Sequence, residues 1–349
     1  MIPVFDGHND FVQRLMAAGP RAAALWRDGD GTGHLDLPRV RAGGMVGGLF
    51  ALWIPDLQHG DLDGLLTRMQ NPPFALDLPP QVPHAAALPQ AFAQAAHLLA
   101  LDRAGLLRLC RSAADIRAAM VADRIAAVLH MEGAEAIRDM DALHLWHAAG
   151  LRSLGPVWSR PTAYGHGVPF AFPASPDTGE GLTPDGRALV RECNALRIML
   201  DLSHLNEKGC DDVARLSDAP LVASHSCAHA IAPSSRNLTD RQLRQIAESG
   251  GLVGLNFASG FLRPDGKRLP VQGFDTMLRH LDHLLAILGE DGVALGSDFD
   301  GALMPADLPD AAALPRLIGA MQDHGYGSAL VEKIAWRNWL SMLDRTWGG

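Results

Sequence analysis

Lysine and cysteine are scarce in this sequence, and both shortages limit what the protein can be. Only three lysines occur in 349 residues, and the first of them is Lys208. A mechanism that needs an active-site lysine in the first 200 residues is therefore excluded. The four cysteines, Cys110, Cys193, Cys210 and Cys227, show no paired spacing. Such cysteines are typical of reduced thiols, and we therefore expect a cytoplasmic protein.

The chain also lacks the sequence features of a membrane protein, a secreted precursor and a nucleic-acid-binding protein. No run of 18 or more apolar residues is present, so we expect no membrane-spanning helix. The first ten residues, MIPVFDGHND, lack the charged and apolar regions of a signal peptide. The net charge is −9 and no concentrated basic patch occurs, which argues against nucleic acid as a partner. With 48% hydrophobic residues the chain can bury a large core, which excludes disorder as its main state.

Short apolar segments that alternate with helical patterns predict the fold. Alternating strands and helices are typical of a parallel sheet, and eight such units fit a (β/α)8 TIM-type barrel. The rival, an open doubly wound sheet, would show a glycine-rich turn after its first strand. The sequence there is Asp6-Gly7-His8-Asn9-Asp10 instead. The eight predicted strands are Ile2–Asp6, Met45–Ile54, Ile125–His130, Arg152–Val157, Ile198–Leu202, Leu221–Ala223, Gly251–Asn256 and Val293–Gly296.

The absence of a low-complexity linker predicts one domain over residues 1–349. Its three long connections, at about 55–89, 160–186 and 257–273, all follow predicted strands. They leave the carboxyl-terminal face, where barrels of this type build their active sites. We expect them to cover a site or to form subunit contacts.

Residues able to bind metals stand at the ends of several predicted strands. His8 and Asp10 follow the first strand, and Glu132 ends the third. His204 and His225 follow the fifth and sixth strands. Imidazole and carboxylate groups together suit Zn²⁺ or a similar divalent ion. Each motif alone also fits a structural histidine or a salt-bridged carboxylate, but their convergence on one barrel face predicts a metal site.

The number of candidate ligands predicts two metal ions. Five ligands exceed what a single tetrahedral zinc with an open position accepts. Two ions, about 3.5–4 Å apart and joined by a carboxylate, would use all five. A carboxylated lysine bridge is excluded because no lysine precedes Lys208. Glu132 is then the bridging candidate, with His8 and Asp10 on one ion and His204 and His225 on the other. Asp298, which ends the eighth strand in GSDFDG, would face the same axis.

The segments DGHND, HMEG, LDLSH, ASHS and GSDFDG, in this order between residues 5 and 301, resemble the membrane (renal) dipeptidase family of the amidohydrolase superfamily. The resemblance implies a metallo-dipeptidase on a (β/α)8 barrel with two zinc ions. By position, His8, Asp10, Glu132, His204 and His225 match the family's metal ligands. Asp298 matches the acid that contacts the bridging water. The resemblance also implies tolerance of a D-residue at the carboxyl-terminal position, as in L-Xaa-D-Xaa, and a homodimer.

The family resemblance extends to substrate-binding positions, with one departure. Arg236, followed by Asn237, matches the arginine that holds the substrate carboxylate, a role that suits its bidentate guanidinium. Trp158 stands where the family has a histidine that stabilises the oxyanion. Indole donates one hydrogen bond but carries no charge. His166, eight residues later, is a candidate replacement or an exposed loop residue, and Tyr164 is a candidate pocket wall.

The expected reaction is hydrolysis of a dipeptide by a hydroxide that bridges two Zn²⁺ ions. Metal binding lowers the pKa of water from 15.7 to about 7. Arg236 would hold the substrate carboxylate, and Asp298 would accept the proton and deliver it to the leaving amine. Mn²⁺ and Co²⁺ accept similar ligands. Two alternatives stay open: another amidohydrolase reaction, on N-acyl amino acids or cyclic amides, and a non-catalytic binding protein on a barrel scaffold.

Overall fold

A ring of eight parallel strands forms the centre of the computed structural model, which describes residues 1–55 and 62–348. Five strands pair in the order β1-β2-β5-β6-β8, and three pair in the order β11-β10-β9. Each predicted strand overlaps one strand of the ring. The ring strands are β1 Val4–Asn9, β2 Met45–Trp53, β5 Ala126–Glu132, β6 Leu151–Gly155, β8 Met199–Leu200, β9 Val222–Ser226, β10 Leu252–Leu255 and β11 Val293–Leu295.

Two isolated bridges join the two sheets into a closed barrel. Asp201 pairs with Val222 between β8 and β9, and Asn9 pairs with Phe299 between β1 and the segment after β11. Backbone hydrogen bonds accompany these bridges: Leu202 N–H donates to Val222 O (2.8 Å) at the first. At the second, Asp298 N–H donates to His8 O (3.0 Å) and Asp10 N–H donates to Phe299 O (2.8 Å). We call these two junctions the seams. The closed ring confirms the predicted (β/α)8 barrel.

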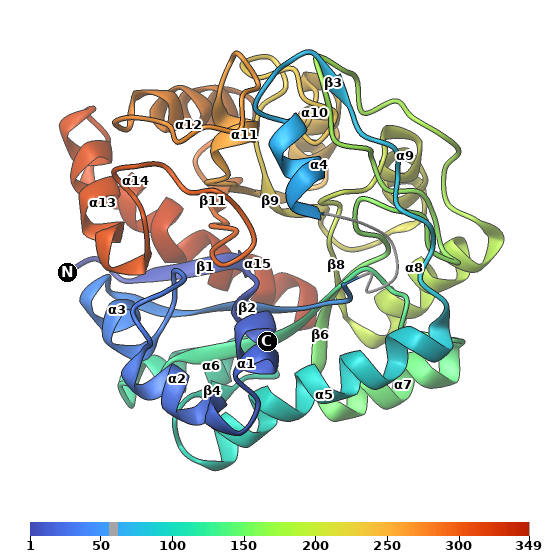
Figure 1. The fold of residues 1–349 in the computed structure, drawn as a ribbon, viewed down its shortest axis with the longest axis horizontal. Coiled ribbons are helices and arrows are strands. Elements are labelled where there is room, and N and C mark those ends of the chain that lie inside the picture. The colour runs from blue at the N-terminus through green and yellow to red at the C-terminus, as the bar shows by residue number, and fades with distance from the viewer. Residues whose placement is uncertain (56–61, 349) are drawn as a thin grey trace.

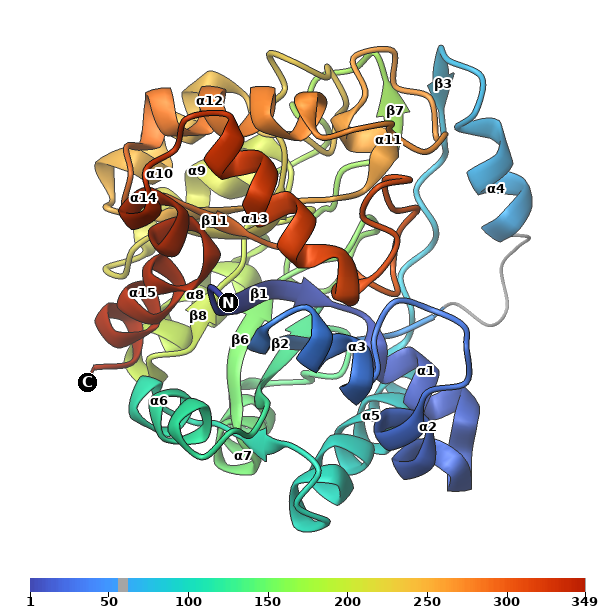
Figure 2. The same cartoon turned by 90° about the vertical axis from the view of Figure 1, so that its left-hand side faces the viewer.

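Helices surround the strands (Figures 1 and 2). Helices such as α8, α10 and α12 lie between successive ring strands, as the helical patterns between the apolar segments predict. Among the described residues, none of the helices combines the length and apolar character that crossing a bilayer requires. The helices are α1 Phe11–Ala18, α2 Ala22–Asp28, α3 Leu37–Ala42, α4 Leu62–Arg68, α5 His84–Arg103, α6 Ala113–Val121, α7 Met140–Ala149, α8 Pro184–Leu196, α9 Glu207–Leu216, α10 Asp240–Glu248, α11 Ser259–Leu262, α12 Asp275–Leu288, α13 Leu314–Asp323, α14 Ser328–Glu332 and α15 Asn338–Trp347.

The hydrophobic core has two layers, as a barrel requires. One apolar cluster lies between the strands and the surrounding helices. A second fills the barrel interior with inward-facing side chains, among them Phe5, Leu49 and Val128. Trp339 of α15 joins this inner cluster, and its indole N–H donates to the Leu295 carbonyl at 2.8 Å. The amino-terminal end of the barrel is therefore filled, which leaves the carboxyl-terminal end for a site.

The long connections carry short elements of their own at this end. The segment after β2 contains α4 and β3 Phe74–Ala75, and residues 56–61 of the predicted 55–89 loop lie outside the described residues. The 160–186 connection contains β7 Ala171–Phe172, which pairs antiparallel with β3. In Figure 2, α4, β3 and β7 lie on the side toward which β1 runs. β4 Arg108–Leu109 pairs with β5 elsewhere in the fold.

Candidate metal centre

The predicted metal-binding side chains meet at the carboxyl-terminal end of the barrel. Glu132 is the last residue of β5, and His225 lies within β9. His204 follows β8 in a left-handed backbone conformation, with φ of 69°. Asp10 lies beyond the end of β1, where it is the N-cap residue of α1. His8 therefore comes from β1 itself, whereas Asp10 comes from the start of α1.

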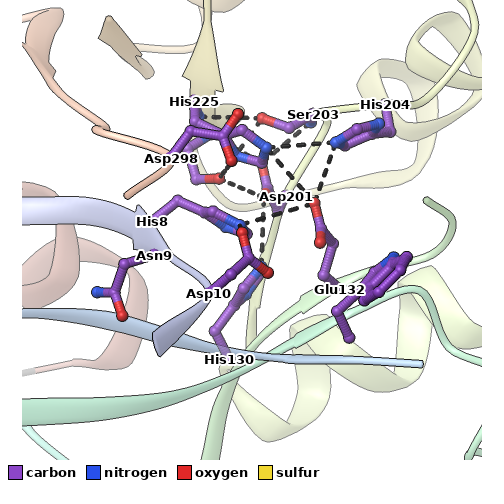
Figure 3. A network of polar contacts seen from close by, with 12 residues as sticks. His8, Asn9, Asp10, His130, Glu132, Asp201, Ser203, His204, His225 and Asp298 are labelled. Carbon is purple, nitrogen blue, oxygen red and sulfur yellow. Dashed lines mark hydrogen bonds and ion pairs between the residues drawn. The ribbon is translucent and has the colours of Figure 1, made fainter. Parts of the chain in front are cut away.

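Two ligand sets form around one carboxylate oxygen. His8 Nε2 lies 3.4 Å from Asp10 Oδ2 and 3.7 Å from Glu132 Oε1. On the other side, Glu132 Oε1 lies 3.0 Å from His204 Nε2 and 3.4 Å from His225 Nε2. Within each set, the potential ligand atoms all lie within 4.8 Å of one another. Figure 3 shows the Glu132 side chain reaching between the two groups.

The electrostatics of these groups fit a divalent cation. Burial raises the pKa of Glu132 well above its usual range, and the charges of Asp10 and Asp298 raise it further. Burial, with the nearby Asp300, raises the pKa of Asp10 to about 7. Carboxylates crowded together away from water are costly unless a cation compensates them.

The histidines are suited to ligation because they are held neutral. Burial lowers the pKa of His8, His204 and His225 below the usual value, and neutral imidazole is the form that binds metal. Among the described residues, neither ring nitrogen of His8 has a hydrogen-bond partner. Buried polar atoms without partners are rare, and here they line a site with the donor set of a metal centre.

Hydroxyl groups orient two of the candidate ligands. Ser224 Oγ lies 2.8 Å from His225 Nδ1 and donates to the Asp201 carboxylate. Ser159 Oγ lies 2.8 Å from His204 Nδ1. Contacts of this kind fix the ring orientation and leave Nε2 directed at the centre. Asp201 in turn accepts the Ser224 N–H at 2.8 Å and the Ser203 N–H at 3.0 Å.

Asp298 lies beside the ligand sets, and its carboxylate is oriented by an amide. Its Oδ2 accepts a hydrogen bond from Asn256 Nδ2 at 3.0 Å. Burial, with the nearby Asp10, raises the pKa of Asp298. Asp298 also has a positive φ of 62°, which is uncommon for a residue other than glycine and typical of sites that constrain a side chain.

Arg236 reaches the same end of the barrel from the loop after β9. Its side chain is buried, and its Nη atoms donate to Ser226 Oγ at 3.0 Å and to the His225 carbonyl at 2.8 Å. Nε has no partner among the described residues. Asn237 stabilises this loop, because its Nδ2 donates to the Ala232 and Phe261 carbonyls at 2.8 Å each.

A cavity of about 290 Å³ opens above the metal centre. Trp158 is part of its lining, and its ring centroid lies 5.7 Å from that of His204. The cavity joins acidic groups on one side to an apolar surface on the other. Its lining includes Asp10, Glu132, His204 and Asp298, together with Trp53, Leu66, Met69, Trp158, Phe170 and Phe261.

Among the predicted substrate-binding residues, Trp158 lines the cavity. The other four are not among its lining residues: Tyr164, His166, Arg236 and Asn237. Tyr164 is buried in the outer core, and its hydroxyl donates to the Ile137 carbonyl at 2.9 Å. His166 is outside the cavity lining, with its Cβ next to Gly179. The pocket-wall interpretation of Tyr164 and the replacement role of His166 gain no support from this arrangement.

Several residues of the site carry no role in the sequence-based interpretation. Ser159, Ser224 and Asn256 all contact candidate ligands or Asp298. Ser224 directly precedes His225, so its contact with this histidine could have been predicted from the sequence. Ser159 and Asn256 come from other strands than the groups they orient, and no local pattern indicates them.

Comparisons with known proteins agree with this geometry. Residues 1–346 match the family model "Membrane dipeptidase (Peptidase family M19)". A metallo peptidase from Rhodobacter sphaeroides, solved with a phosphinate mimic of the dipeptide L-Ala-D-Ala, is 58% identical over 99% of both chains, with a TM-score of 0.97. The solved structure of the dipeptidase AC, a metallo peptidase, is 57% identical over 100% of this chain and 99% of its own, with a TM-score of 0.96. An uncharacterized Klebsiella pneumoniae protein from the pqqA 5' region is 50% identical over 248 residues, which is 70% of this chain and 90% of that protein. The chain therefore belongs to the membrane dipeptidase family and is a hydrolase of the metallo-dipeptidase type.

Proposed function

We propose that this protein hydrolyses the peptide bond of dipeptides, including L-Xaa-D-Xaa dipeptides, at a centre that holds two zinc ions. The single observation that carries the proposal is Glu132 Oε1, which is shared by the His8/Asp10 pair and the His204/His225 pair. The Rhodobacter sphaeroides relative, which binds a mimic of L-Ala-D-Ala, supports a dipeptide with a D-residue at its carboxyl-terminal position.

Different residues of this chain have separate roles in the proposed reaction. The five candidate ligands would hold two zinc ions, which when bound would supply polarisation of the scissile carbonyl and a water molecule of lowered pKa. Asp298 would accept a proton and return it to the leaving amine, a contribution of roughly 10²–10⁴-fold. Asn256 holds the Asp298 carboxylate in one orientation. Arg236 has a guanidinium that can bind the substrate carboxylate through two parallel hydrogen bonds.

Metal analysis and hydrolysis of a dipeptide panel on one purified sample test the proposal. The panel pairs L-Xaa-L-Xaa with L-Xaa-D-Xaa dipeptides and includes N-acyl amino acids and cyclic amides. We expect about two metal ions per chain and dipeptide hydrolysis that a chelator abolishes. Two metal ions with cleavage of only N-acyl or cyclic amides would contradict the dipeptidase assignment and favour the other amidohydrolase reaction.

A comparison of free-acid dipeptides with their amides tests the proposed role of Arg236. In Arg236→Lys, the charge remains but the fork is lost, so KM should rise for free-acid dipeptides and change little for the matching dipeptide amides. Arg138→Lys is the matched control. Arg138 is exposed, and among the described residues it pairs only with its neighbour Asp139. An equal rise in KM for acid and amide would remove Arg236 from this role.

A further inference from the structure

Arg160 is a buried arginine behind the cavity, and the mechanism above does not use it. Its side chain is 1% exposed, and its Nε donates to Glu135 Oε1 at 2.5 Å. Its Nη2 donates to the Ile54 carbonyl at the end of β2. The guanidinium carbon lies 5.4 Å from the Trp158 ring centroid and 5.9 Å from that of Trp53. Arg160 therefore connects the ends of β2, β5 and β6.

The partner of Arg160 belongs to the turn that follows the shared ligand. Glu135 lies three residues after Glu132, and its Oε2 has no hydrogen-bond partner among the described residues. Gly133 has a φ of 88°, and a Cβ there would lie 2.4 Å from Glu135 Oε2. The turn thus requires glycine both for its backbone and for the approach of the carboxylate. This local packing places the buried Glu135 carboxylate within hydrogen-bond distance of Arg160 Nε.

An aromatic wall, defined as Trp53, Trp158, Phe170 and Phe261, lines the cavity. Trp53 and Trp158 meet edge to face with ring centroids 5.3 Å apart, and Trp158 meets Phe170 in the same way at 5.6 Å. Phe170 and Phe261 follow at 5.8 Å. The wall therefore runs as one series of contacts from Trp53 to Phe261.

The two ends of the aromatic wall face different residues of the proposed dipeptide. Its Phe261 end lies under Arg236, whose guanidinium carbon is 5.8 Å from the Phe261 ring centroid. Arg236 is the proposed carboxylate-binding group, so this end belongs to the carboxyl-terminal residue of a dipeptide. In the proposed reaction the scissile bond lies at the candidate metal ligands, and one of these, His204, is next to Trp158. The Trp53–Trp158 end then faces the amino-terminal residue.

We propose that Arg160 is a positioning residue that holds the Trp53–Trp158 pair in place, and that this pair selects an apolar side chain on the amino-terminal residue of the dipeptide. The guanidinium lies over both rings within cation–π distance, and the compact ammonium of lysine would not reach both in the same way. Its charge is compensated by Glu135, so the face that the tryptophans present to the cavity is uncharged and apolar. This inference rests on the proposed dipeptidase function.

The test compares selectivity at the two dipeptide positions in the zinc-loaded enzyme. The ratio of kcat/KM for Leu-Ala over Asp-Ala reports on the amino-terminal position, and that for Ala-Leu over Ala-Asp reports on the carboxyl-terminal position. We expect Arg160→Lys and Trp158→Leu to lower the first ratio about tenfold, a typical effect of lost apolar complementarity, and to leave the second within about twofold. Arg138→Lys, on the surface beyond the same turn, should change neither ratio.

Near-ultraviolet circular dichroism gives a readout that does not depend on activity. The tryptophan band lost in Trp158→Phe should be weakened in Arg160→Lys and retained in Arg138→Lys. If Arg160→Lys fails to fold, the double variant Arg160→Met/Glu135→Gln removes both buried charges together and takes its place.

Unchanged amino-terminal selectivity in Trp158→Leu would overturn the proposal, as would an unchanged circular dichroism band in the folded Arg160 variant. A change confined to the carboxyl-terminal ratio would overturn it as well. Failure of the proposed function is distinguishable, because the wild-type enzyme would then cleave none of the four dipeptides while the circular dichroism comparison would still decide whether Arg160 holds the pair.

Discussion

At the scale of single residues, the proposed proton-transfer role of Asp298 can be tested separately from metal binding. Its carboxylate is held by Asn256, whereas the two ligand sets are complete without it. We therefore expect Asp298→Asn to keep its metal and to lose at least ~100-fold in kcat. Metal analysis and steady-state kinetics on the same preparation measure both properties. Asp291→Asn is the control, since Asp291 is largely exposed and pairs with Lys333. A kcat near that of wild type in Asp298→Asn would remove Asp298 from proton transfer.

Individual residues also show where sequence reasoning ends. The candidate metal ligands could be recognised because each lies at or shortly after the carboxyl-terminal end of a strand, and the fold brings these ends together. Ser159 could not be recognised, because its contact with His204 depends on how the chain turns after Trp158. Tyr164 is the opposite case, because the sequence suggests a pocket wall and the structure packs the side chain into the outer core. An aromatic residue in a loop next to a site can pack into the outer core when its hydroxyl finds a backbone carbonyl there.

At the scale of elements, the ends of β8 and β9 form one polar unit. Asp201, after β8, accepts the hydroxyl of Ser224 in β9, and Ser224 contacts His225 Nδ1. We expect Ser224→Ala to lower metal affinity by roughly 10–100-fold, because the imidazole loses the group that orients it. Titration against a competing chelator measures the affinity. Ser175→Ala, on an exposed turn, should bind metal as wild type does. An affinity equal to wild type in Ser224→Ala would contradict an orienting role.

The packing of α12 on the barrel predicts a pH dependence of stability. His280 Nδ1 accepts the Ala228 N–H, and Nε2 donates to the Leu262 carbonyl, so the ring is bound in its neutral form. Burial lowers its pKa from 6.5 to about 4. Between these values the unfolded chain binds a proton that the folded protein does not. The free energy of unfolding should therefore fall as the pH drops from 6.5 towards 4, by up to ~1.4 kcal/mol per pH unit.

Denaturant unfolding at a series of pH values measures this effect in wild type and in His280→Gln. The variant is expected to be less stable at neutral pH and to show a shallower fall in acid. Part of the fall should remain, because burial also lowers the pKa of His34 to about 4. Parallel curves for the two proteins would show that His280 does not contribute.

The locations of the strands were more predictable from the sequence than the residues at which the strands end. Apolar segments such as Met45–Ile54 are long enough to locate a strand, and β2 covers Met45–Trp53. The end of β1 was not predictable, because the register shifts between Asp6 and Asn9 depend on pairing with β2. Strand ends are set by tertiary pairing, and the chemistry of this fold is built on strand ends.

At the scale of the whole molecule, the candidate ligands span the two sheets of the barrel. His8 and Glu132 belong to the larger sheet, and His225 belongs to the smaller one. The sheets otherwise meet at the seams, where isolated bridges replace a continuous ladder. Metal ions held by residues of both sheets would therefore strengthen the closure of the barrel as well as supply the chemistry. Without them, the same crowded carboxylates would repel one another across this end.

Hydrogen exchange with and without chelator tests this coupling. Metal removal should speed exchange at the seam amides of Leu202 and Asp298, which donate to Val222 and His8, more than at amides in the middle of the β2–β5 pair. Ligand binding to the folded state stabilises it by about 2.7 kcal/mol at a hundredfold excess over Kd, so the melting temperature should fall as well. Restoring Zn²⁺ should reverse both changes. Uniform acceleration across all strands would mean that the metals stabilise the fold globally, and that the seams have no special dependence on them.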